Sequence, residues 1–270
     1  KLPKIPRNYQ FMSASFYGIF AALERLEIHN CKALEDLSCL AEMTNLKHLD
    51  LFNCQNLKNI DGLGELKNLE YLHLGWPESL ENFEVLGRLY GLQQLNLSSA
   101  SNLINLTDLR GLKNLSTLTI FSCKNLESLD GLSGVENLET LEIRGSSLEN
   151  INELHSLRSL VCIEMSNCTL NSLKDLKVFR QHGNLRKLKL THCSSLCDVG
   201  DLSVLQELEF LDLSNCPFVQ MLAPLKECKS LRDFIFSDPA ESIRVLSCTV
   251  RNDPDFLKSK RREWLGVTKK

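Results

Sequence analysis

Cysteine and histidine are the residues of this sequence with the most evident chemistry. The chain of 270 residues holds 11 cysteines and 6 histidines, and thiolate and imidazole groups bind zinc or take part in redox reactions. Cys193, Cys197 and His192 lie close together in the sequence. No Cys-x-x-Cys pair is followed by a second pair, however, as a zinc finger would require. The sequence therefore predicts no metal site and no cofactor.

The histidines would form a metal site or a pH switch if the fold brought them together. His29, His48 and His73 each lie in a run of alternating leucines, which predicts a strand that exposes the histidine on one face. They fall at different positions within their runs, so we interpret them as ordinary surface histidines. The sequence also lacks Ser/His/Asp sets, paired carboxylates and glycine-rich phosphate loops with catalytic spacing. We expect no enzymatic activity and no small-molecule substrate.

Charge and hydropathy narrow the classes of partner. The chain holds 31 Lys and Arg residues against 34 Asp and Glu residues, with a net charge of -3, so no field over the whole molecule favours nucleic acid or an anionic membrane. Polar residues interrupt the leucines every few positions, and no run approaches the ~18 apolar residues that a membrane span needs. We expect neither a nucleic-acid partner nor a membrane span.

A fixed internal period organises most of the sequence. Units begin at leucines spaced by 23 residues, except for one spacing of 22 and one of 25. Within each unit a period of two, typical of a strand, changes to a period of three, typical of a 3₁₀ or irregular return. One unit buries too few aliphatic side chains to order its own backbone, so the units must stack in order to fold. The ten units begin at Leu23, Leu46, Leu69, Leu92, Leu115, Leu138, Leu160, Leu185, Leu208 and Leu231.

Each unit resembles the leucine-rich-repeat signature L-x-x-L-x-L-x-x-C/N, of which LKHLDLFNCQNLKNIDGLGELKN from Leu46 is a clean copy. The resemblance implies an α/β leucine-rich-repeat solenoid, a curved right-handed coil with a parallel β-sheet on its concave face. The convex side would be 3₁₀, short helical or irregular. The 22-residue unit at Leu138 resembles the short intracellular class of a nuclear protein-phosphatase regulator and of bacterial internalins. The longer units resemble repeats of plant intracellular immune receptors and of protozoan proteins.

The period divides the chain into three parts. Residues 23–245 form about ten repeats, residues 1–22 a degenerate half-repeat that caps the N-terminal end, and residues 246–270 a C-terminal cap or basic tail. Tyr17 and Phe20 would plug the N-terminal end. At the other end Asp253 and Pro254 predict the start of a helix. The basic residues in this segment form either the solvated face of a capping helix or a nuclear-import or phosphate-contacting patch: Lys258, Lys260, Arg261 and Arg262.

Six cysteines share one position in the repeat, directly after the predicted strand. The resemblance places Asn or Cys there, with a side chain that serves the backbone groups of a buried turn. Buried unpaired thiols fit a reducing compartment, which favours a cytoplasmic or nuclear location over a secreted one. Asn-x-Ser/Thr sequons, the acceptor motif for N-glycosylation, would instead favour a secreted protein. They occur at Asn96, Asn105, Asn114 and Asn167, but the recurring Asn-Leu-Ser/Thr of the repeats produces such motifs easily, and we discount them. The six cysteines are Cys31, Cys54, Cys123, Cys168, Cys193 and Cys216.

The outward positions of the predicted strands define a candidate binding face, because side chains alternate across a strand. The column between the second and third leucines of each unit is predominantly polar, and we expect acidic patches near both of its ends. Its members are Glu27, Asp50, His73, Asn96, Thr119, Glu142, Glu164, Lys189, Asp212 and Ile235.

Aromatic residues on this face are the candidate anchors for a protein partner. Phe52, Tyr71, His73 and Trp76 lie on adjacent units, and Phe121 and Phe210 lie further along. The alternative is that Phe52 and Trp76 fold over the strand edges or pack on another part of a longer chain.

We therefore predict a protein–protein interaction module that binds a protein partner on its concave face, as an intracellular regulator or as the sensing part of a receptor. Two alternatives remain open. The solenoid would be a structural subunit of a large assembly, or a secreted adhesin of the internalin kind.

Overall fold

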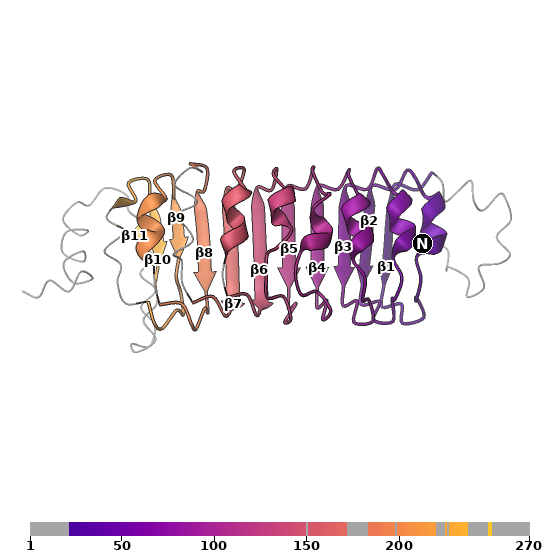
Figure 1. Ribbon diagram of the computed structural model, residues 1–270, viewed down its shortest axis with the longest axis horizontal. Coiled ribbons are helices and arrows are strands. Elements are labelled where there is room, and N and C mark those ends of the chain that lie inside the picture. Colours follow the sequence, from indigo (N-terminus) through magenta and orange to yellow (C-terminus); the bar gives the residue numbers. More distant parts are fainter. Residues whose placement is uncertain are drawn as a thin grey trace, which may run out of the picture.

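The structure is a computed structural model, and it describes residues 22–149, 151–171, 183–197, 199–219, 225, 227–236 and 248–249. Within this part of the chain the strands lie side by side in chain order as one sheet (Figure 1). Strands β1 to β10 pair in parallel, and β11 pairs antiparallel with β10. The predicted caps around Tyr17 and Phe20 and from Asp253 onward lie outside the described residues.

The bounds of the strands follow the predicted period, because each strand begins two residues after the leucine that opens its unit. The strands are β1 (Arg25–His29), β2 (His48–Phe52), β3 (Tyr71–Gly75), β4 (Gln94–Ser98), β5 (Thr117–Phe121), β6 (Thr140–Ser146), β7 (Cys162–Cys168), β8 (Lys187–Thr191), β9 (Phe210–Asp212), β10 (Asp233–Ile235) and β11 (Cys248–Thr249).

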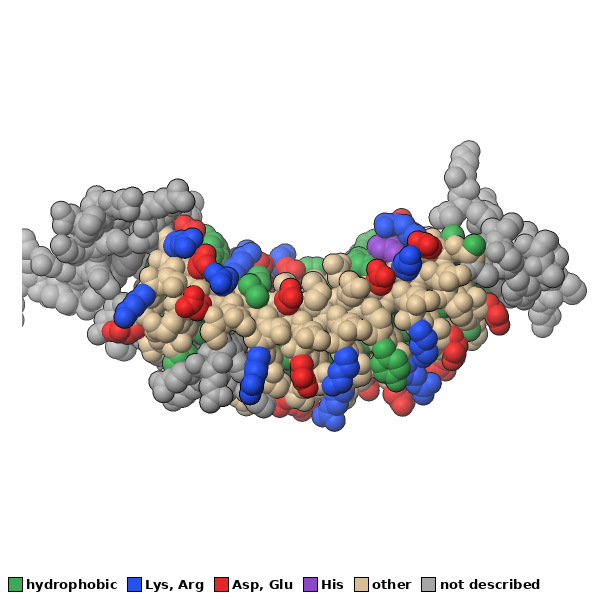
Figure 2. Space-filling model, turned by 90° about the horizontal axis from the view of Figure 1, so that it is seen from above, with side chains coloured by type: hydrophobic (Ala, Val, Ile, Leu, Met, Phe, Trp, Pro, Cys, Tyr) green, Lys and Arg blue, Asp and Glu red, His purple; other side chains and the backbone are tan. Residues whose placement is uncertain are grey.

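Short 3₁₀ turns return the chain from one strand to the next and form a second layer against the sheet (Figure 1). They lie where the sequence changes from a period of two to a period of three. The molecule is bent, and the strands line its hollowed side while the turns line the outside (Figure 2). The turns are η2 (Ser38–Glu42), η3 (Asp61–Glu65), η4 (Glu84–Arg88), η5 (Thr107–Leu109), η6 (Leu132–Gly134), η7 (Asn152–Ser156) and η9 (Gly200–Val204).

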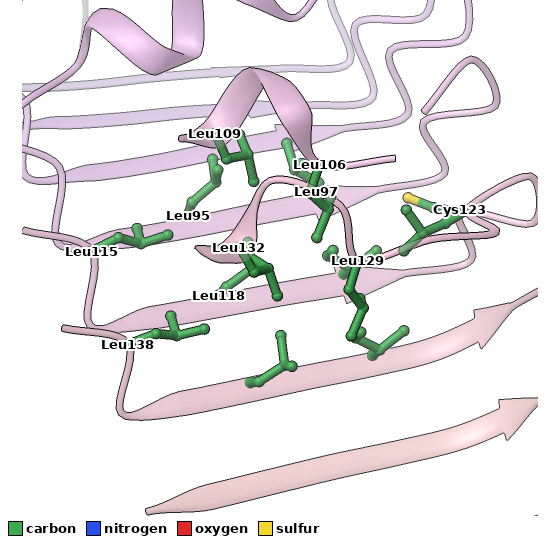
Figure 3. Close-up of a cluster of buried hydrophobic side chains, with 14 of the residues drawn as sticks. Leu95, Leu97, Leu106, Leu109, Leu115, Leu118, Cys123, Leu129, Leu132 and Leu138 are labelled. Carbon is green, nitrogen blue, oxygen red and sulfur yellow. The ribbon is translucent and has the colours of Figure 1, made fainter. Parts of the chain in front are cut away.

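Leucines fill the space between the two layers (Figure 3). In β5 the inward residues Leu118 and Ile120 are both 0% exposed, and Leu109 of η5 and Leu132 of η6 are equally buried. Each repeat meets only its neighbours, so the core grows along the axis of the solenoid and no single repeat contains it. The parallel sheet, the 3₁₀ convex side and the stacked leucine core confirm the predicted leucine-rich-repeat solenoid.

The cysteines at the shared repeat position stack as predicted. Cys54, Cys123, Cys168, Cys193 and Cys216 are buried and unpaired, and Cys31 in the first repeat is half-buried. The Cys54 thiol donates to the carbonyl oxygen of Ile28 at 3.6 Å, and that of Cys216 to Leu190 at 3.2 Å. Cys123 and Cys193 donate to carbonyl oxygens at the ends of their own strands, so the buried thiols serve backbone groups at the turn, which is the role that the resemblance implied.

Asparagine side chains make a second set of bonds between repeats, and the sequence analysis did not find it. The Nδ2 group of Asn68 donates to the carbonyl oxygen of Thr44 at 2.9 Å, Asn114 to Tyr90 at 2.8 Å and Asn137 to Lys113 at 2.8 Å. Asn114 is also one of the sequons, and here its amide nitrogen already serves the preceding repeat. The recurrence of asparagine before the opening leucine of these units was the available signal.

Adjacent turns on the convex side approach so closely that they exclude side chains. A Cβ atom at Gly111 would lie 1.9 Å from the carbonyl oxygen of Gly87, whereas a Cβ atom at Gly183 would meet nothing within 4 Å. Gly111 is therefore required for the stacking of neighbouring repeats.

We predict that Gly111→Ala lowers the free energy of unfolding by about 2 kcal/mol, because the added methyl group must push two backbone segments apart. Gly183→Ala is the matched control and should leave the free energy of unfolding unchanged within about 0.5 kcal/mol. Urea unfolding followed by circular dichroism measures both. Equal midpoints for the two variants would show that the convex turns separate without cost.

Candidate functional site

Pairing in register arranges the outward side chains of the sheet in three columns across the concave face. The middle column is the predicted one, because Glu27 pairs with Asp50, Asp50 with His73, and so on along the sheet. Phe52 lies in a column on one side of it, and Tyr71 in a column on the other. The six predicted site residues therefore all lie on or beside the hollowed face, although at different places along it.

Cations of the neighbouring columns neutralise several carboxylates of the middle column, for which we expected acidic patches near both ends. Arg25 of a neighbouring column donates to the Glu27 carboxylate at 2.8 Å, and that contact holds the pKa of Glu27 below its usual range. Lys187 pairs with Glu164, and Arg144 pairs with Glu142. The neighbouring columns supply cations that one column read alone does not reveal.

Phe52, His73 and Trp76 come together at the N-terminal part of the face. The ring centroids of Phe52 and Trp76 lie 5.1 Å apart, and those of Phe52 and His73 lie 6.0 Å apart. Phe52 and Trp76 are each 37% exposed. They form a pair of partly exposed rings, and we call Phe52, His73 and Trp76, with Tyr71, the aromatic patch.

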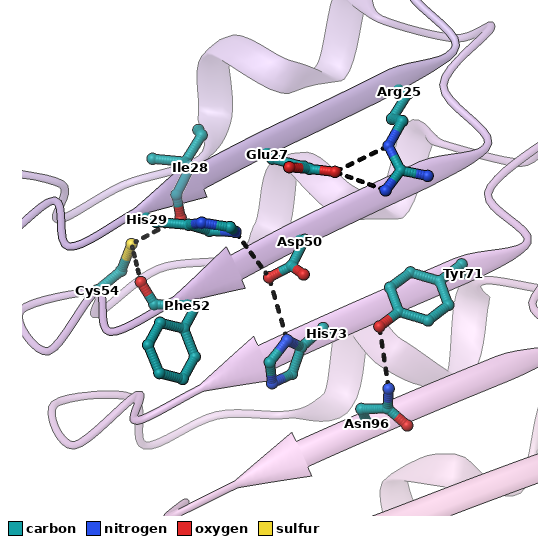
Figure 4. A network of polar contacts seen from close by, with 10 residues as sticks. All are labelled: Arg25, Glu27, Ile28, His29, Asp50, Phe52, Cys54, Tyr71, His73 and Asn96. Carbon is teal, nitrogen blue, oxygen red and sulfur yellow. Dashed lines mark hydrogen bonds and ion pairs between the residues drawn. The ribbon is translucent and has the colours of Figure 1, made fainter.

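A carboxylate lies at the centre of the patch. Asp50 Oδ1 is 3.0 Å from His73 Nδ1 and 3.4 Å from His29 Nε2 (Figure 4). The sequence analysis separated these histidines because they occupy different columns, but neighbouring columns converge on the same carboxylate. The described residues nevertheless contain no group of three His, Cys, Asp or Glu side chains suited to a metal ion.

Tyr71 lies beside the group formed by Asp50, His29 and His73 and is not part of it. Its ring stacks on His48 with the centroids 4.1 Å apart, and its hydroxyl accepts a hydrogen bond from Asn96 at 3.0 Å. Burial under the tyrosine ring, together with the nearby Arg25 charge, lowers the pKa of His48. Tyr71 and His48 thus form a stacked pair at the side of the patch.

The other two predicted aromatics lie apart from the patch and are covered by cations. Arg144 lies over the ring of Phe121, 5.1 Å from its centroid, and Lys187 lies over Phe210 at 5.7 Å. Between β6 and β8 the face has a polar hollow of about 250 Å³, lined among others by Arg144, Glu164 and Lys189. The concave face therefore has an aromatic end and a charged, hydrogen-bonding end.

Trp76 has a backbone conformation that its side chain disfavours. Its φ is 55°, in the left-handed region where bulky side chains are outliers. The residue directly after the strand has a positive φ in repeat after repeat. In this conformation its backbone N–H donates to a carbonyl oxygen of the next repeat. Trp76 N, for example, donates to Ser98 O at 2.7 Å. The non-glycine occupants in the described residues are Asn30, Asn53, Trp76, Ser99, Ser122, Asn167, His192 and Asn215.

Asparagine, serine and glycine suit this position, since short polar side chains tolerate the left-handed region. A tryptophan there costs roughly 1–2 kcal/mol. Strain of this kind gathers at functional sites, and Trp76 is also the exposed ring of the patch. The sequence carried this signal in the recurrence of Asn and Ser one position before the cysteine.

No family model matches the sequence, and no curated protein sequence matches it. Comparison with solved structures is informative. The leucine-rich repeat domain of the type III effector XCV3220 (XopL) aligns with a TM-score of 0.63 and 19% identity, over 86% of this chain and 86% of that one. The chain has the leucine-rich-repeat fold.

Two further structures share this fold. Internalin C2 from Listeria monocytogenes aligns with a TM-score of 0.57 and 18% identity, over 82% of this chain and 84% of that chain. The leucine-rich-repeat ectodomain of the plant membrane receptor kinase GASSHO1/SCHENGEN3 from Arabidopsis thaliana, solved in complex with CASPARIAN STRIP INTEGRITY FACTOR 2, aligns with a TM-score of 0.56 and 20% identity. That match covers 82% of this chain but only 30% of the receptor chain.

A helix long and apolar enough to cross a membrane is not found in the part of the chain that the structure describes.

We predict that the buried thiols resist alkylation in the native protein. Burial raises the pKa of Cys123 to about 11, so only about one thiol in a thousand is ionised at pH 8. Exposed Cys197 is the internal control. Peptide mapping after brief treatment with iodoacetamide should find Cys197 modified and Cys123 intact until denaturant is added. Equal labelling of the two cysteines would contradict the burial of the Cys123 thiol.

We also predict that Trp76→Asn is more stable than Trp76→Ala by about 1 kcal/mol, because asparagine tolerates the left-handed backbone and alanine does not. Both substitutions remove the indole ring, so the difference isolates the backbone term. Thermal and urea unfolding measure it. If the two variants unfold together, the positive φ of Trp76 carries no strain.

Proposed function

We propose that this chain is a protein–protein interaction module that binds a protein partner on its concave face, at the aromatic patch. One observation carries the proposal: Phe52 and Trp76 are exposed side by side on the hollowed face, and Trp76 occupies a backbone position that disfavours it. Neither ring is needed to close the core, and exposed aromatic clusters are the usual anchors of protein interfaces.

The partner is a protein and not a nucleic acid on electrostatic grounds. The net charge is -3, and cations of the concave face pair with its carboxylates, as Arg144 does with Glu142 and Lys187 with Glu164. Phosphate backbones require a surplus of positive charge on the binding surface.

A cytoplasmic or nuclear location is part of the proposal and rests on the thiols. Ten cysteines are free in the described residues, and Cys197 and Cys39 among them are exposed. Exposed and unpaired thiols suit a reducing compartment. The chain would act there as a regulator or as the recognition part of a receptor.

Site-specific photo-crosslinking tests the proposal. A benzoylphenylalanine residue replaces exposed Gln94 of β4 on the concave face, or, as the control, exposed Glu65 of η3 on the convex side, in cells of the organism that makes the protein. We expect the Gln94 position to give one or a few discrete protein adducts and the Glu65 position to give none. Changing Phe52, Tyr71 and Trp76 to alanine should remove the adducts while the thermal midpoint changes little.

The alternatives predict different patterns. A structural subunit of a large assembly would crosslink from Glu65 as well as from Gln94, because fixed neighbours surround it. A secreted adhesin would give adducts only when the protein is added outside cells. Adducts that persist in the triple-alanine variant would contradict the role of the aromatic patch.

A further inference from the structure

The polar hollow between β6 and β8 lies where short side chains follow a long one along a column of the sheet. In register, Arg144 of β6 pairs with Ser166 of β7, and Ser166 pairs with Thr191 of β8. Arg144 has a long side chain, whereas the next two positions carry only short hydroxyl side chains. These three residues line a hollow of about 250 Å³ that the chain itself does not fill.

The short side chains of the hollow bring hydrogen-bond donors to its surface. Ser166 is half-buried, and Thr191 is 7% exposed. Within the part of the chain that the structure describes, neither hydroxyl makes a hydrogen bond. A hydroxyl group donates one hydrogen bond and rotates to suit its acceptor. Both hydroxyls are therefore available to donate to a ligand in the hollow.

A lysine without a partner lies beside these hydroxyls. Lys189 of β8 is half-buried and lines the hollow, and among the described residues it forms no ion pair and no hydrogen bond. Its neighbour in the register is Asp212 of β9. That residue is only 7% exposed, and its carboxylate accepts hydrogen bonds from the N–H and the hydroxyl of Ser214. The charge of Lys189 is thus available to a ligand.

Arg144 borders the same hollow and is held in place by its neighbours. Its guanidinium lies over the ring of Phe121, 5.1 Å from the ring centroid, and it pairs with Glu142. A guanidinium has five N–H donors in a rigid fork, and the contact with Glu142 does not occupy all of them. Arg144 can therefore donate to a second oxygen acceptor without leaving Glu142.

Glu164 is the carboxylate that lines the hollow, and the chain itself provides its counter-ions. Lys187 Nζ lies 2.5 Å from its Oε1, and Arg144 lies 3.8 Å from its Oε2. The carboxylates at this end of the face are thus all engaged by donors of the chain, while Lys189 is not. The attraction for an anion is therefore local, and it suits one anionic group and not a polyanion.

We propose that the hollow between β6 and β8 binds one anionic group, a carboxylate or a phosphate, on a side chain of the protein partner. Lys189 supplies the charge, Arg144 donates from the free part of its fork, and the hydroxyls of the floor donate to the remaining oxygens. An anion with several oxygens fits best because the unpaired groups of the hollow are donors. The inference rests on the proposed function and names a second contact of the same partner.

One partner can contact both the hollow and the aromatic patch. Four strand spacings separate β3 from β7, which is about 19 Å at ~4.8 Å each. A standard protein interface covers about 800 Å² on each partner and is roughly 30 Å across. The two sites therefore fit within one interface, with an apolar contact at one end and a charged contact at the other.

The test uses three small probes: the N-acetyl methylamides of glutamate, phosphoserine and glutamine. Each is titrated into the full chain labelled with nitrogen-15, and the amide signals of Ser166 and Asn167 are followed by NMR, with the amide of Gly75 as a distant reference. We expect an anionic probe to shift the first two signals with saturation, at least about fivefold more tightly than the neutral glutamine probe.

The two anionic probes distinguish the source of the anion. Saturation by both would assign the hollow to acidic side chains in general, and saturation by phosphoserine alone would assign it to a phosphorylated partner. Either result supports the inference. Equal affinity of the glutamine probe, or no shift of Ser166 and Asn167 with either anion, would overturn it.

The matched variants are Lys189→Gln and Lys47→Gln. Lys189→Gln removes the unpaired charge and should weaken binding of the anionic probe at least about fivefold. Lys47 is an exposed cation that pairs with Glu24 in the first repeats, so its loss should leave binding unchanged. Ser166→Phe keeps every charge but fills the hollow, and it should abolish binding. Unchanged binding in Lys189→Gln and Ser166→Phe would also overturn the inference.

The crosslinking experiment separates this inference from the proposed function. We expect Lys189→Glu to lower the yield of adducts at Gln94 several-fold. Adducts that vanish in the triple-alanine variant but keep their full yield in Lys189→Glu would leave the interface in place and refute the contact at the hollow. Binding of the anionic probes at Ser166 without any protein adduct at Gln94 would uphold the anion site and refute the proposed function.

Discussion

The pairing of parallel strands in register is the constraint on which the rest of this structure depends. Each strand residue hydrogen-bonds beside the residue one repeat later, so Asp50 lies next to His73, and Phe52 next to Gly75. Side chains at the same position of successive repeats therefore form a column along the solenoid. The buried columns consist mainly of leucine and cysteine, and the exposed columns form the concave face. A slip of one residue in any strand would exchange the two sets, which the burial of leucine forbids.

This constraint also sets where side chains are tolerated. On the convex side the turns approach until a Cβ atom at Gly111 would collide with the carbonyl oxygen of Gly87. At the end of each strand the chain must turn through a left-handed residue to donate its N–H to the next repeat. Asparagine and serine meet that demand at little cost. Trp76 does not, so the needs of the fold do not account for a tryptophan at this position.

The two ends of the concave face differ in the side chains that they expose. Toward the C-terminal end, cations and carboxylates from neighbouring columns satisfy one another, as Lys187 and Glu164 do. Burial raises the pKa of Glu164, but its interactions with Lys187, Lys189 and Arg144 together hold that pKa below its usual range. Toward the N-terminal end, the rings of Phe52 and Trp76 have only each other and the imidazoles around Asp50. One end of the face thus presents ion pairs around a polar hollow, and the other presents accessible aromatic surface.

The sequence alone determined the fold, the burial of the repeated leucines and the burial of the cysteines at the shared repeat position. These follow from a period that is local and repeated ten times, so every unit confirms the others. It also placed Phe52, Tyr71 and His73 on one face, because alternation along a strand decides which side a residue occupies. It did not predict the ion pairs of the middle column, since it treated that column without its neighbours.

Only the tertiary structure decided which of those residues meet. The carboxylate shared by His29 and His73, the stacking of Tyr71 on His48, and the contact of Phe52 with His73 and Trp76 all join side chains of different repeats. Rotamers and strand twist set those contacts, and a one-dimensional repeat pattern does not contain them. For the same reason the strain at Trp76 became visible only as a backbone angle. The sequence period assigns each residue to a column, and the packing of side chains from different repeats forms the candidate site.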